Sequence, residues 1–364
     1  MTTPRTITLR SGISIGDDAP CFIVAEIGNN HQGSVVTARE MIDRAAEAGA
    51  QGVKFQKRDM DALLTTAGRA APYTGKNSFG TTYGEHRLAL ELSIDEMADL
   101  KEYSEKQGLV FFASAWDMPS LEQILELDVE LCKVASADLV NVPLLRRHAQ
   151  SGIPTILSTG MSAFEDIDIA VRELSTGIDD LVVLHCNSSY PCPEDQIGLP
   201  VMQVLRERYG LPIGYSGHER GLGPSVASLA FGACVVERHF TLDRTLPGTD
   251  HQVSLEPSDL AALVKMIREV EPAMQVKGKM VFPNEVNAAR KLRKCIVASR
   301  DLPAGHVLTE ADVATRSPQD GISPVHWDKV IGATLRTDMK YEEPLQWDHI
   351  DAREEQSSLA AAMA

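Results

Sequence analysis

The stretch LVFFASAWDMPSLEQILELDVELCKVAS (109–136) contains the unit on which the fold is built. A short apolar run (109–115) leads into an amphipathic pattern (118–128), and a second apolar run follows (131–136). Both runs hold β-branched or aromatic residues and are nearly continuous rather than alternating, which is typical of strands buried on both faces of a parallel sheet. The stretch therefore predicts a strand, a helix and a second, parallel strand.

The same unit repeats on either side of this stretch. Apolar runs that predict strands lie at 22–27, 52–56, 109–115, 131–136, 154–159, 181–186, 211–216 and 234–240. Amphipathic patterns that predict helices lie at 35–50, 93–108, 118–128, 164–174, 223–233 and 257–274. This alternation predicts an α/β fold, a (β/α)8 TIM barrel. The alternative is a doubly wound open sheet, but the first strand is not followed by the glycine-rich phosphate turn that such a sheet normally has.

Three further features accompany the barrel pattern. The segment 6–16 alternates around a Ser-Gly turn and predicts a hairpin that caps the bottom of the barrel. The insert 57–92 is long for a loop that follows a barrel strand, and such loops are usually functional. Ser93, with Glu96 three residues later, and Ser258 predict the starts of two helices.

The pattern changes after about residue 280, where short strands and a Pro-Ala-Gly turn appear. We predict a TIM-barrel domain over 1–280, a linker over 281–290, a small β-rich domain over 291–352 and a flexible tail over 353–364.

The composition narrows the class of protein. The net charge of −16 and the lack of a basic stripe argue against a nucleic-acid partner. No run of about 18 consecutive apolar residues occurs, which argues against a membrane span. The N-terminus MTTPRTITLR lacks the apolar segment of a signal peptide, so we expect a cytoplasmic protein. The six cysteines form no CxxC pair, and we expect buried, reduced thiols.

Polar side chains stand where the predicted strands end, and catalytic residues of TIM barrels lie at these ends. In chain order they are Glu26, Lys54, Gln56, Ser114, Lys133, Ser136, Asp138, Ser158, Thr159, Asn187, Ser188, Tyr190, Ser216, His218, Glu237 and His239. A barrel with a purely structural role would not need a polar group at nearly every strand end.

Two chemical groups can be separated in this set. The two lysines, together with the serine hydroxyls, suit an anion such as a phosphate or a carboxylate. His218 and His239 lie on adjacent strands and suit a divalent metal, with Glu26 and Asp138 as oxygen donors nearby. Each histidine taken alone is more often held by hydrogen bonds than by a metal, so the pairing of the two carries the metal hypothesis.

Several motifs resemble the sialic acid synthase family in order and spacing. They are FIVAEIGNNHQG (22–33), GVKFQ (52–56), CKVASAD (132–138), ILSTGM (156–161), LHCNSSYP (184–191), GYSGHE (214–219) and ERHFTLDRTLPGTDH (237–251). The C-terminal segment resembles the antifreeze-like (SAF) domain of these enzymes. The resemblance implies a transferase of sialic acid biosynthesis, an N-acetylneuraminate synthase. Such an enzyme condenses phosphoenolpyruvate with an N-acylmannosamine-type sugar (N-acetylmannosamine or its 6-phosphate) and releases phosphate.

The resemblance also implies roles for individual residues. His218 and His239 would hold the metal, Mn²⁺ first, with Mg²⁺ or Co²⁺ as alternatives. Phosphoenolpyruvate would be bound by Lys54, Ser114, Lys133, Ser136, Ser158, Ser188 and Ser216. The sugar would be bound by Gln56, Tyr83, Asp138, Tyr190, Asp250 and Arg316. Glu26, Lys54, Lys133, Asp138, His218 and His239 form the expected catalytic set, in which Glu26 would handle the attacking water. Arg316 would reach a neighbouring subunit's site, which implies a homodimer with swapped C-terminal domains.

One motif departs from the family pattern. Where many relatives have Gly-Ser-Gly-Glu, this chain has Ala135-Ser136-Ala137-Asp138. The departure leaves the sugar open, with legionaminic-type and KDN-type acids as alternative products. Two further hypotheses are another phosphoenolpyruvate-dependent synthase of keto-deoxy acids, and a binding protein whose antifreeze-like domain is the working part.

Overall fold

The computed structural model describes residues 5–275 and 278–351, so the predicted tail at 353–364 lies outside the described residues. The chain forms two compact units, Met1–Gln275 and Val276–Ala364. The division falls close to residue 280, where the sequence pattern changes. Each unit is described by itself below.

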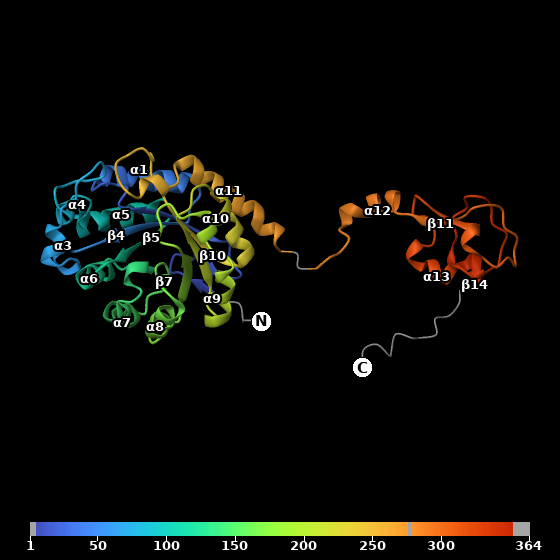
Figure 1. The fold of residues 1–364 in the computed structure, drawn as a ribbon, viewed down its shortest axis with the longest axis horizontal. Helices are drawn as coiled ribbons and strands as arrows, with labels where there is room; N and C mark the ends of the chain where they lie inside the picture. The colour runs from blue at the N-terminus through green and yellow to red at the C-terminus, as the bar shows by residue number, and fades with distance from the viewer. Residues whose placement is uncertain (1–4, 276–277, 352–364) are drawn as a thin grey trace. The chain divides into compact units, whose positions relative to one another are not determined.

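The first unit is a closed barrel of eight parallel strands, which confirms the predicted TIM barrel (Figure 1). The strands are β3 (Phe22–Gly28), β4 (Gly52–Lys57), β5 (Val110–Ala115), β6 (Cys132–Val134), β7 (Thr155–Ser158), β8 (Leu181–Cys186), β9 (Ile213–Gly217) and β10 (Ala233–His239). β10 pairs with β3 and closes the ring. Almost every strand residue is buried, as expected for strands covered on both faces.

Helices surround the strands and bury their apolar faces against them (Figure 1). They are α1 (Val35–Glu47), α5 (Ile94–Lys106), α6 (Met118–Glu126), α7 (Val142–Ser151), α8 (Phe164–Leu174), α9 (Val201–Tyr209), α10 (Gly223–Ala227) and α11 (Pro257–Ala273). The helix predicted over 223–233 is shorter than expected. It continues as the 3-10 turn η3 (Ser228–Phe231) and ends at Gly232, whose φ of 87° stops it.

The capping predictions had different outcomes. Ser93 caps α5 as predicted, because its hydroxyl accepts from Glu96 N while its own backbone N–H donates to the Glu96 carboxylate. The prediction for Ser258 was wrong, because α11 begins one residue earlier. Proline fixes φ near the helical value and suits the first helical position, so Pro257 occupies it and Glu256 becomes the cap.

The predicted N-terminal hairpin is present as β1 (Thr6–Thr8) and β2 (Ser14–Gly16). Ile7 and Ile15 share one buried cluster with Phe22 and Val110, which begin β3 and β5. The hairpin therefore closes the N-terminal end of the barrel, as predicted, and leaves the C-terminal ends of the strands for a site.

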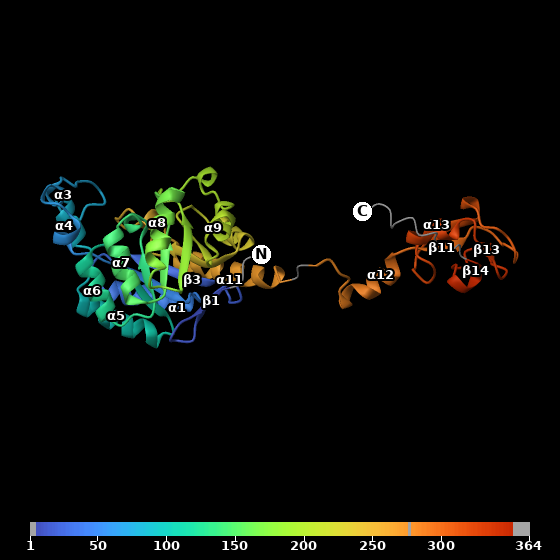
Figure 2. The same cartoon turned by 90° about the horizontal axis from the view of Figure 1, so that it is seen from below.

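The insert 57–92 is a folded layer with three short helices, α2 (Met60–Leu63), α3 (Thr66–Ala70) and α4 (Tyr83–Leu88). α3 and α4 lie at the outer edge of the barrel (Figure 2). Buried His86 stacks on Tyr73 with ring centroids 4.4 Å apart, and Thr82 forms a capping box with Glu85. The insert is thus held by its own contacts.

The second unit has a small core of its own, which includes Ile296, Leu308, Val330 and Leu345. Its elements are α12 (Val286–Leu292), β11 (Cys295–Ala298), β12 (Val313–Arg316), α13 (Trp327–Val330), β13 (Thr334–Leu335) and β14 (Ile350–Asp351). The segment 281–290, predicted as a linker, holds the 3-10 turn η5 (Pro283–Glu285) and the start of α12.

Two general expectations can also be compared with the structure. All six cysteines are buried and free, as predicted. Within the described ranges, no helix combines the length and the apolar character needed to cross a lipid bilayer.

Candidate active site

The C-terminal ends of the barrel strands surround a cavity of about 210 Å³. Strand register brings polar groups to one level, since Glu26 pairs with His239 on one side and Lys54 on the other. The lining residues are Glu26, Lys54, Gln56, Ser114, Trp116, Lys133, Ala135, Ser136, Ala137, Ser158, Met161, Cys186, Ser188, Tyr190, Ser216, His218, Glu237 and His239. The structure therefore brings most of the predicted site residues together.

Four buried ionisable side chains form the centre of this cavity. Lys54 Nζ lies 2.9 Å from Glu26 Oε2 and 3.6 Å from Glu237 Oε1. Lys133 Nζ lies 3.6 Å from the same Glu237 oxygen. Burial by itself would raise the pKa of Glu237, but the charges of Lys133 and Lys54 hold that pKa at about 2. Two cations and an ionised carboxylate therefore meet at one point.

The two lysines differ in how firmly they keep their protons. Burial opposes the charge of Lys54, but Glu237 and Glu26 compensate and raise its pKa. Burial lowers the pKa of Lys133, with Glu237 acting against this shift and Lys54 adding to it. An anionic ligand placed beside both ammonium groups would favour the charged form of each.

Glu237 had no predicted role, yet it contacts both lysines and accepts from Ser216 Oγ at 3.3 Å. A signal for it was present, because alternation along β10 puts Glu237 on the same side as His239. Trp116, Met161 and Cys186 were also missed, because an apolar residue or a cysteine at a strand end looks like any other core residue.

Hydroxyls from three strand ends gather beside the lysines. Gly160 N donates to Ser136 Oγ at 3.0 Å. A Cβ on Gly160 would overlap Ser188 Oγ and lie 2.9 Å from Ser136 Oγ, so any larger residue there would displace these two hydroxyls. Ser158 Oγ is buried, and no hydrogen-bond partner for it exists among the described residues. These groups can together hold the oxygens of a phosphate or a carboxylate.

His218 and His239 lie beside one another with ring centroids 5.3 Å apart. His218 Nδ1 lies 2.7 Å from Asn187 O, so Nδ1 donates and Nε2 is the ring nitrogen left for a metal. Burial lowers the pKa of His239 to about 3, which keeps its imidazole neutral. Two imidazoles that bind one ion at about 2.1 Å have centroids roughly 5 Å apart. The pair therefore fits a shared metal ion.

The carboxylates predicted near this pair are arranged differently from the expectation. Glu26 is engaged by Lys54 and Gln56, and Asp138 accepts from Asn141 Nδ2 at 3.1 Å and does not line the cavity. In the part of the chain that the structure describes, no three His, Cys, Asp or Glu side chains form a ready metal cluster. A metal held by this pair would leave more of its coordination to water or substrate than a catalytic zinc site with three protein ligands does.

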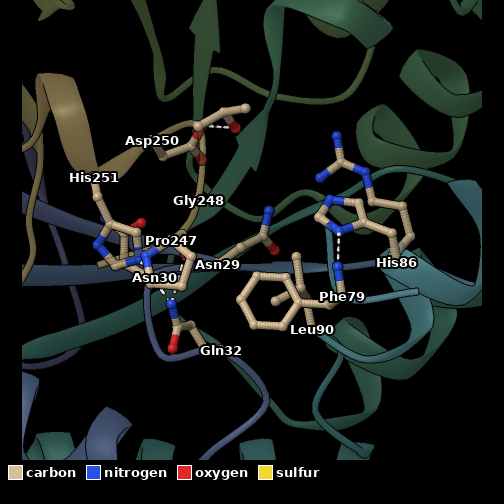
Figure 3. Close-up of a pocket in the computed structure, with 12 residues that line it drawn as sticks. Asn29, Asn30, Gln32, Phe79, His86, Leu90, Pro247, Gly248, Asp250 and His251 are labelled. Atoms are coloured by element: carbon tan, nitrogen blue, oxygen red, sulfur yellow. Dashed lines mark hydrogen bonds between the residues drawn. The ribbon is translucent and has the colours of Figure 1, made fainter. Parts of the chain in front are cut away.

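Asp250 connects the site with a second, smaller cavity (Figure 3). Its Oδ2 lies 4.0 Å from His239 Nδ1. Figure 3 shows the loop that carries Asp250 on one side of this cavity, with Phe79 and His86 of the insert on the other. Gly248 N, on the same loop, donates to Asn77 Oδ1 of the insert at 3.2 Å. The insert thus helps to position Asp250.

Two more residues, Tyr83 and Arg316, were predicted to bind the sugar. Tyr83 lies on α4, where its hydroxyl accepts from Arg87 Nε at 2.9 Å, and it lines neither of the two cavities. Arg316 ends β12 in the second unit, half-exposed, with its Nε 3.3 Å from Glu342 Oε1. The roles of Tyr83, Asp138 and Arg316 stay predictions.

Comparisons with known proteins agree with this geometry. Residues 41–279 match the NeuB family, and residues 293–351 match the SAF domain. The chain is 40% identical over 307 residues to the N-acetylneuraminate-9-phosphate synthase of Homo sapiens, covering 84% of this chain and 86% of that protein. It is 34% identical over 343 residues to the N,N'-diacetyllegionaminic acid synthase of Legionella pneumophila, covering 93% and 96%.

A solved structure extends the likeness to three dimensions. The N-acetylneuraminic acid synthetase of Leptospira borgpetersenii superposes with a TM-score of 0.69 at 36% identity, covering 78% of this chain and 95% of that chain. The resemblance to the sialic acid synthases and to their antifreeze-like domain is thereby confirmed. This chain belongs to the NeuB family and carries a SAF domain at 293–351.

Proposed function

We propose that this protein condenses phosphoenolpyruvate with an N-acylmannosamine-type sugar, N-acetylmannosamine or its 6-phosphate, to give a nine-carbon 2-keto sugar acid and phosphate. One observation carries the proposal. A single cavity holds two buried lysines with serine hydroxyls beside a histidine pair, so an anion and a carbonyl oxygen can be bound side by side. The names of the human and Leptospira relatives point to the same class of reaction.

Each step of the proposed condensation requires a particular group of the cavity. The methylene carbon of phosphoenolpyruvate attacks the aldehyde carbon of the open sugar, which leaves an oxocarbenium-like centre at the enol carbon. Water adds there and loses a proton, which balances the proton taken up by the former aldehyde oxygen. The C–O bond to phosphate then breaks, the phosphate takes the remaining hydroxyl proton, and the keto acid is left. Lys54 and Lys133 hold the phosphate and carboxylate charges throughout. Glu26, which Lys54 contacts at 2.9 Å and Gln56 at 2.6 Å, would accept a proton from the attacking water.

His218 and His239 would hold a divalent ion, Mn²⁺ first with Mg²⁺ or Co²⁺ as alternatives, which when bound polarises the aldehyde oxygen. The hydrogen bond from His218 Nδ1 to Asn187 O orients that ring for the task. Tyr190 packs on His218 with ring centroids 4.1 Å apart and would border the sugar. Gln56 and Asp250 would bind its hydroxyls.

The sugar itself is the least constrained part of the proposal. Relatives of comparable similarity are named for N-acetylneuraminate 9-phosphate and for N,N'-diacetyllegionaminic acid, so a legionaminic-type acid is the alternative product. A KDN-type acid and another keto-deoxy acid are the remaining alternatives.

We further propose that the enzyme works in the cytoplasm as a homodimer with swapped C-terminal domains. In that arrangement Arg316, which is half-exposed within its own unit, would touch the N-acyl group in the partner's site. The free, buried cysteines suit a reducing compartment.

A coupled phosphate-release assay tests the function. The enzyme would be given phosphoenolpyruvate and Mn²⁺ with N-acetylmannosamine, its 6-phosphate, mannose 6-phosphate or a 2,4-diacetamido sugar in turn. We expect turnover of at least one sugar, lost on chelation and restored by Mn²⁺. His239→Ala should keep the fold and lose metal-dependent turnover. Silence on every sugar would refute the function, and an unimpaired His239→Ala variant would refute the ligand role.

A further inference from the structure

Arg58 follows β4 directly and lies behind the catalytic cavity without lining it. Its side chain is 2% exposed, which is unusual for a guanidinium group. The group stacks on the indole of Trp116, 4.3 Å from the ring centroid, and Trp116 lines the cavity. The positive charge of a buried guanidinium group must be balanced by nearby acceptors, and the acceptors around Arg58 indicate its role.

Three oxygens surround the Arg58 guanidinium. Nη1 donates to Asn29 Oδ1 at 2.9 Å and to Glu91 Oε1 at 3.1 Å. Nη2 donates to the side-chain oxygen of Gln56. Glu91 ends the insert and also accepts from the Arg58 backbone N–H at 3.1 Å. The charge is therefore balanced by Glu91, at the far end of the insert, while one edge of the guanidinium group is directed at Gln56.

The neighbours of Gln56 leave its amide one favourable orientation. Arg58 can only donate, and the Glu26 carboxylate can only accept. The amide oxygen therefore faces Arg58, and Nε2 donates to Glu26 Oε1 at 2.6 Å. In the reverse orientation, two donors would face one another at Arg58 and two acceptors at Glu26.

We infer that Arg58 is a positioning residue that fixes the amide of Gln56, and through it Glu26, for the sugar side of the reaction. The inference rests on the proposed function. With one Nε2 hydrogen on Glu26, the other is a donor for an oxygen of the sugar. Through Glu91, Arg58 also joins this orientation to the other end of the insert. The lysines of the anion site receive no direct bond from Arg58.

The test separates positioning from simple structural support. Arg58→Met should raise the KM for the sugar about ten-fold and lower kcat, because a charge-assisted hydrogen bond is lost. The KM for phosphoenolpyruvate should change by clearly less, since Arg58 reaches Lys54 only indirectly, through Gln56 and the 2.9 Å contact of Glu26. Arg147→Met is the matched control. It removes a partly exposed ion pair with Glu122 on the outer helices and should leave both KM values unchanged.

A double-mutant cycle completes the test. Gln56→Leu with Arg58→Met should be little worse than Gln56→Leu alone, because Arg58 acts through Gln56. Independent effects, or equal changes in the KM values of both substrates, would overturn the inference. If Arg58→Met does not fold, Arg58→Lys keeps the charge beside Glu91 and should show the same sugar-selective loss. No turnover by the unmodified enzyme would instead overturn the proposed function, and the inference with it.

Discussion

At the scale of single residues, Gly160 shapes the proposed anion site by lacking a side chain. A Cβ at this position would overlap Ser188 Oγ and crowd Ser136 Oγ. Gly160→Ala should therefore raise the KM for phosphoenolpyruvate about ten-fold or more, because the displaced hydroxyls no longer match the anion. Steady-state kinetics with varied phosphoenolpyruvate would measure this. Gly223→Ala, with open space around its Cβ, is the control. Equal KM values in the two variants would contradict the prediction.

Asp138 carries a buried charge that the fold does not compensate. Asn141 bonds one oxygen, while the other has no hydrogen-bond partner among the described residues. Burial, with the charge of Asp117 adding to it, raises the pKa of Asp138 to about 6. Since the folded state prefers the protonated form, the stability contributed by this group falls as pH rises from about 4 to 6.

Asp138→Asn should accordingly stabilise the protein at pH 8 by on the order of 2 kcal/mol, and by little near pH 4. Denaturant unfolding of the variant and the parent at both pH values measures the difference. A gain of the same size at both values would show that the carboxylate charge is not the cause.

Single site residues could be predicted from the sequence where the barrel determines which way a side chain points. Lys54, Lys133 and His239 point inward because side chains alternate along a strand whose two faces are both packed. Asp138 and Tyr83 lie beyond the strands, where the alternation of side chains along a strand no longer predicts which way they point. Arg58 and Gly160 gave no signal, because their importance lies in what surrounds them.

At the scale of elements, the helix starts allow a controlled test of capping. Ser93→Ala should lower the free energy of unfolding by about 1 kcal/mol, since its hydroxyl and Glu96 satisfy the first turn of α5. Ser258→Ala should change it by less than about 0.5 kcal/mol, because Ser258 is exposed and Glu256 holds the cap position. Denaturant unfolding of the two variants provides the comparison. Equal losses would show that the capping bonds do not decide stability here.

The strands were predicted to within a few residues because continuous apolar runs are required wherever a parallel strand is buried on both faces. The short helices of the insert were not predicted. The insert is held in place by side-chain contacts such as the stacking of Tyr73 on His86 and the bonds of Glu91 to Arg58. These contacts join residues that are far apart in sequence or follow no helical or strand period. The hydrophobic pattern of the sequence therefore does not predict the helices of an insert that is held by such contacts.

At the scale of the whole molecule, the chain has two separate cores. The barrel core joins strands and outer helices, while the second unit closes around its own cluster, which includes Ile296 and Leu345. Each unit thus has the apolar interior that independent folding requires. In the proposed dimer, the barrel of one subunit works with the C-terminal domain of the other. Measurements of enzyme activity can test this arrangement.

Mixing two inactive variants tests the swapped arrangement. His239→Ala disables the barrel site, and Arg316→Ala should weaken sugar use far more than phosphoenolpyruvate binding. In a swapped dimer of one variant with the other, the intact barrel meets the partner's intact C-terminal domain. Co-refolded equal amounts should therefore recover about a quarter of the normal activity, because half of the dimers are mixed and each has one complete site. If Arg316 served its own barrel, no mixed dimer would contain a complete site, and the absence of recovery would refute the swap.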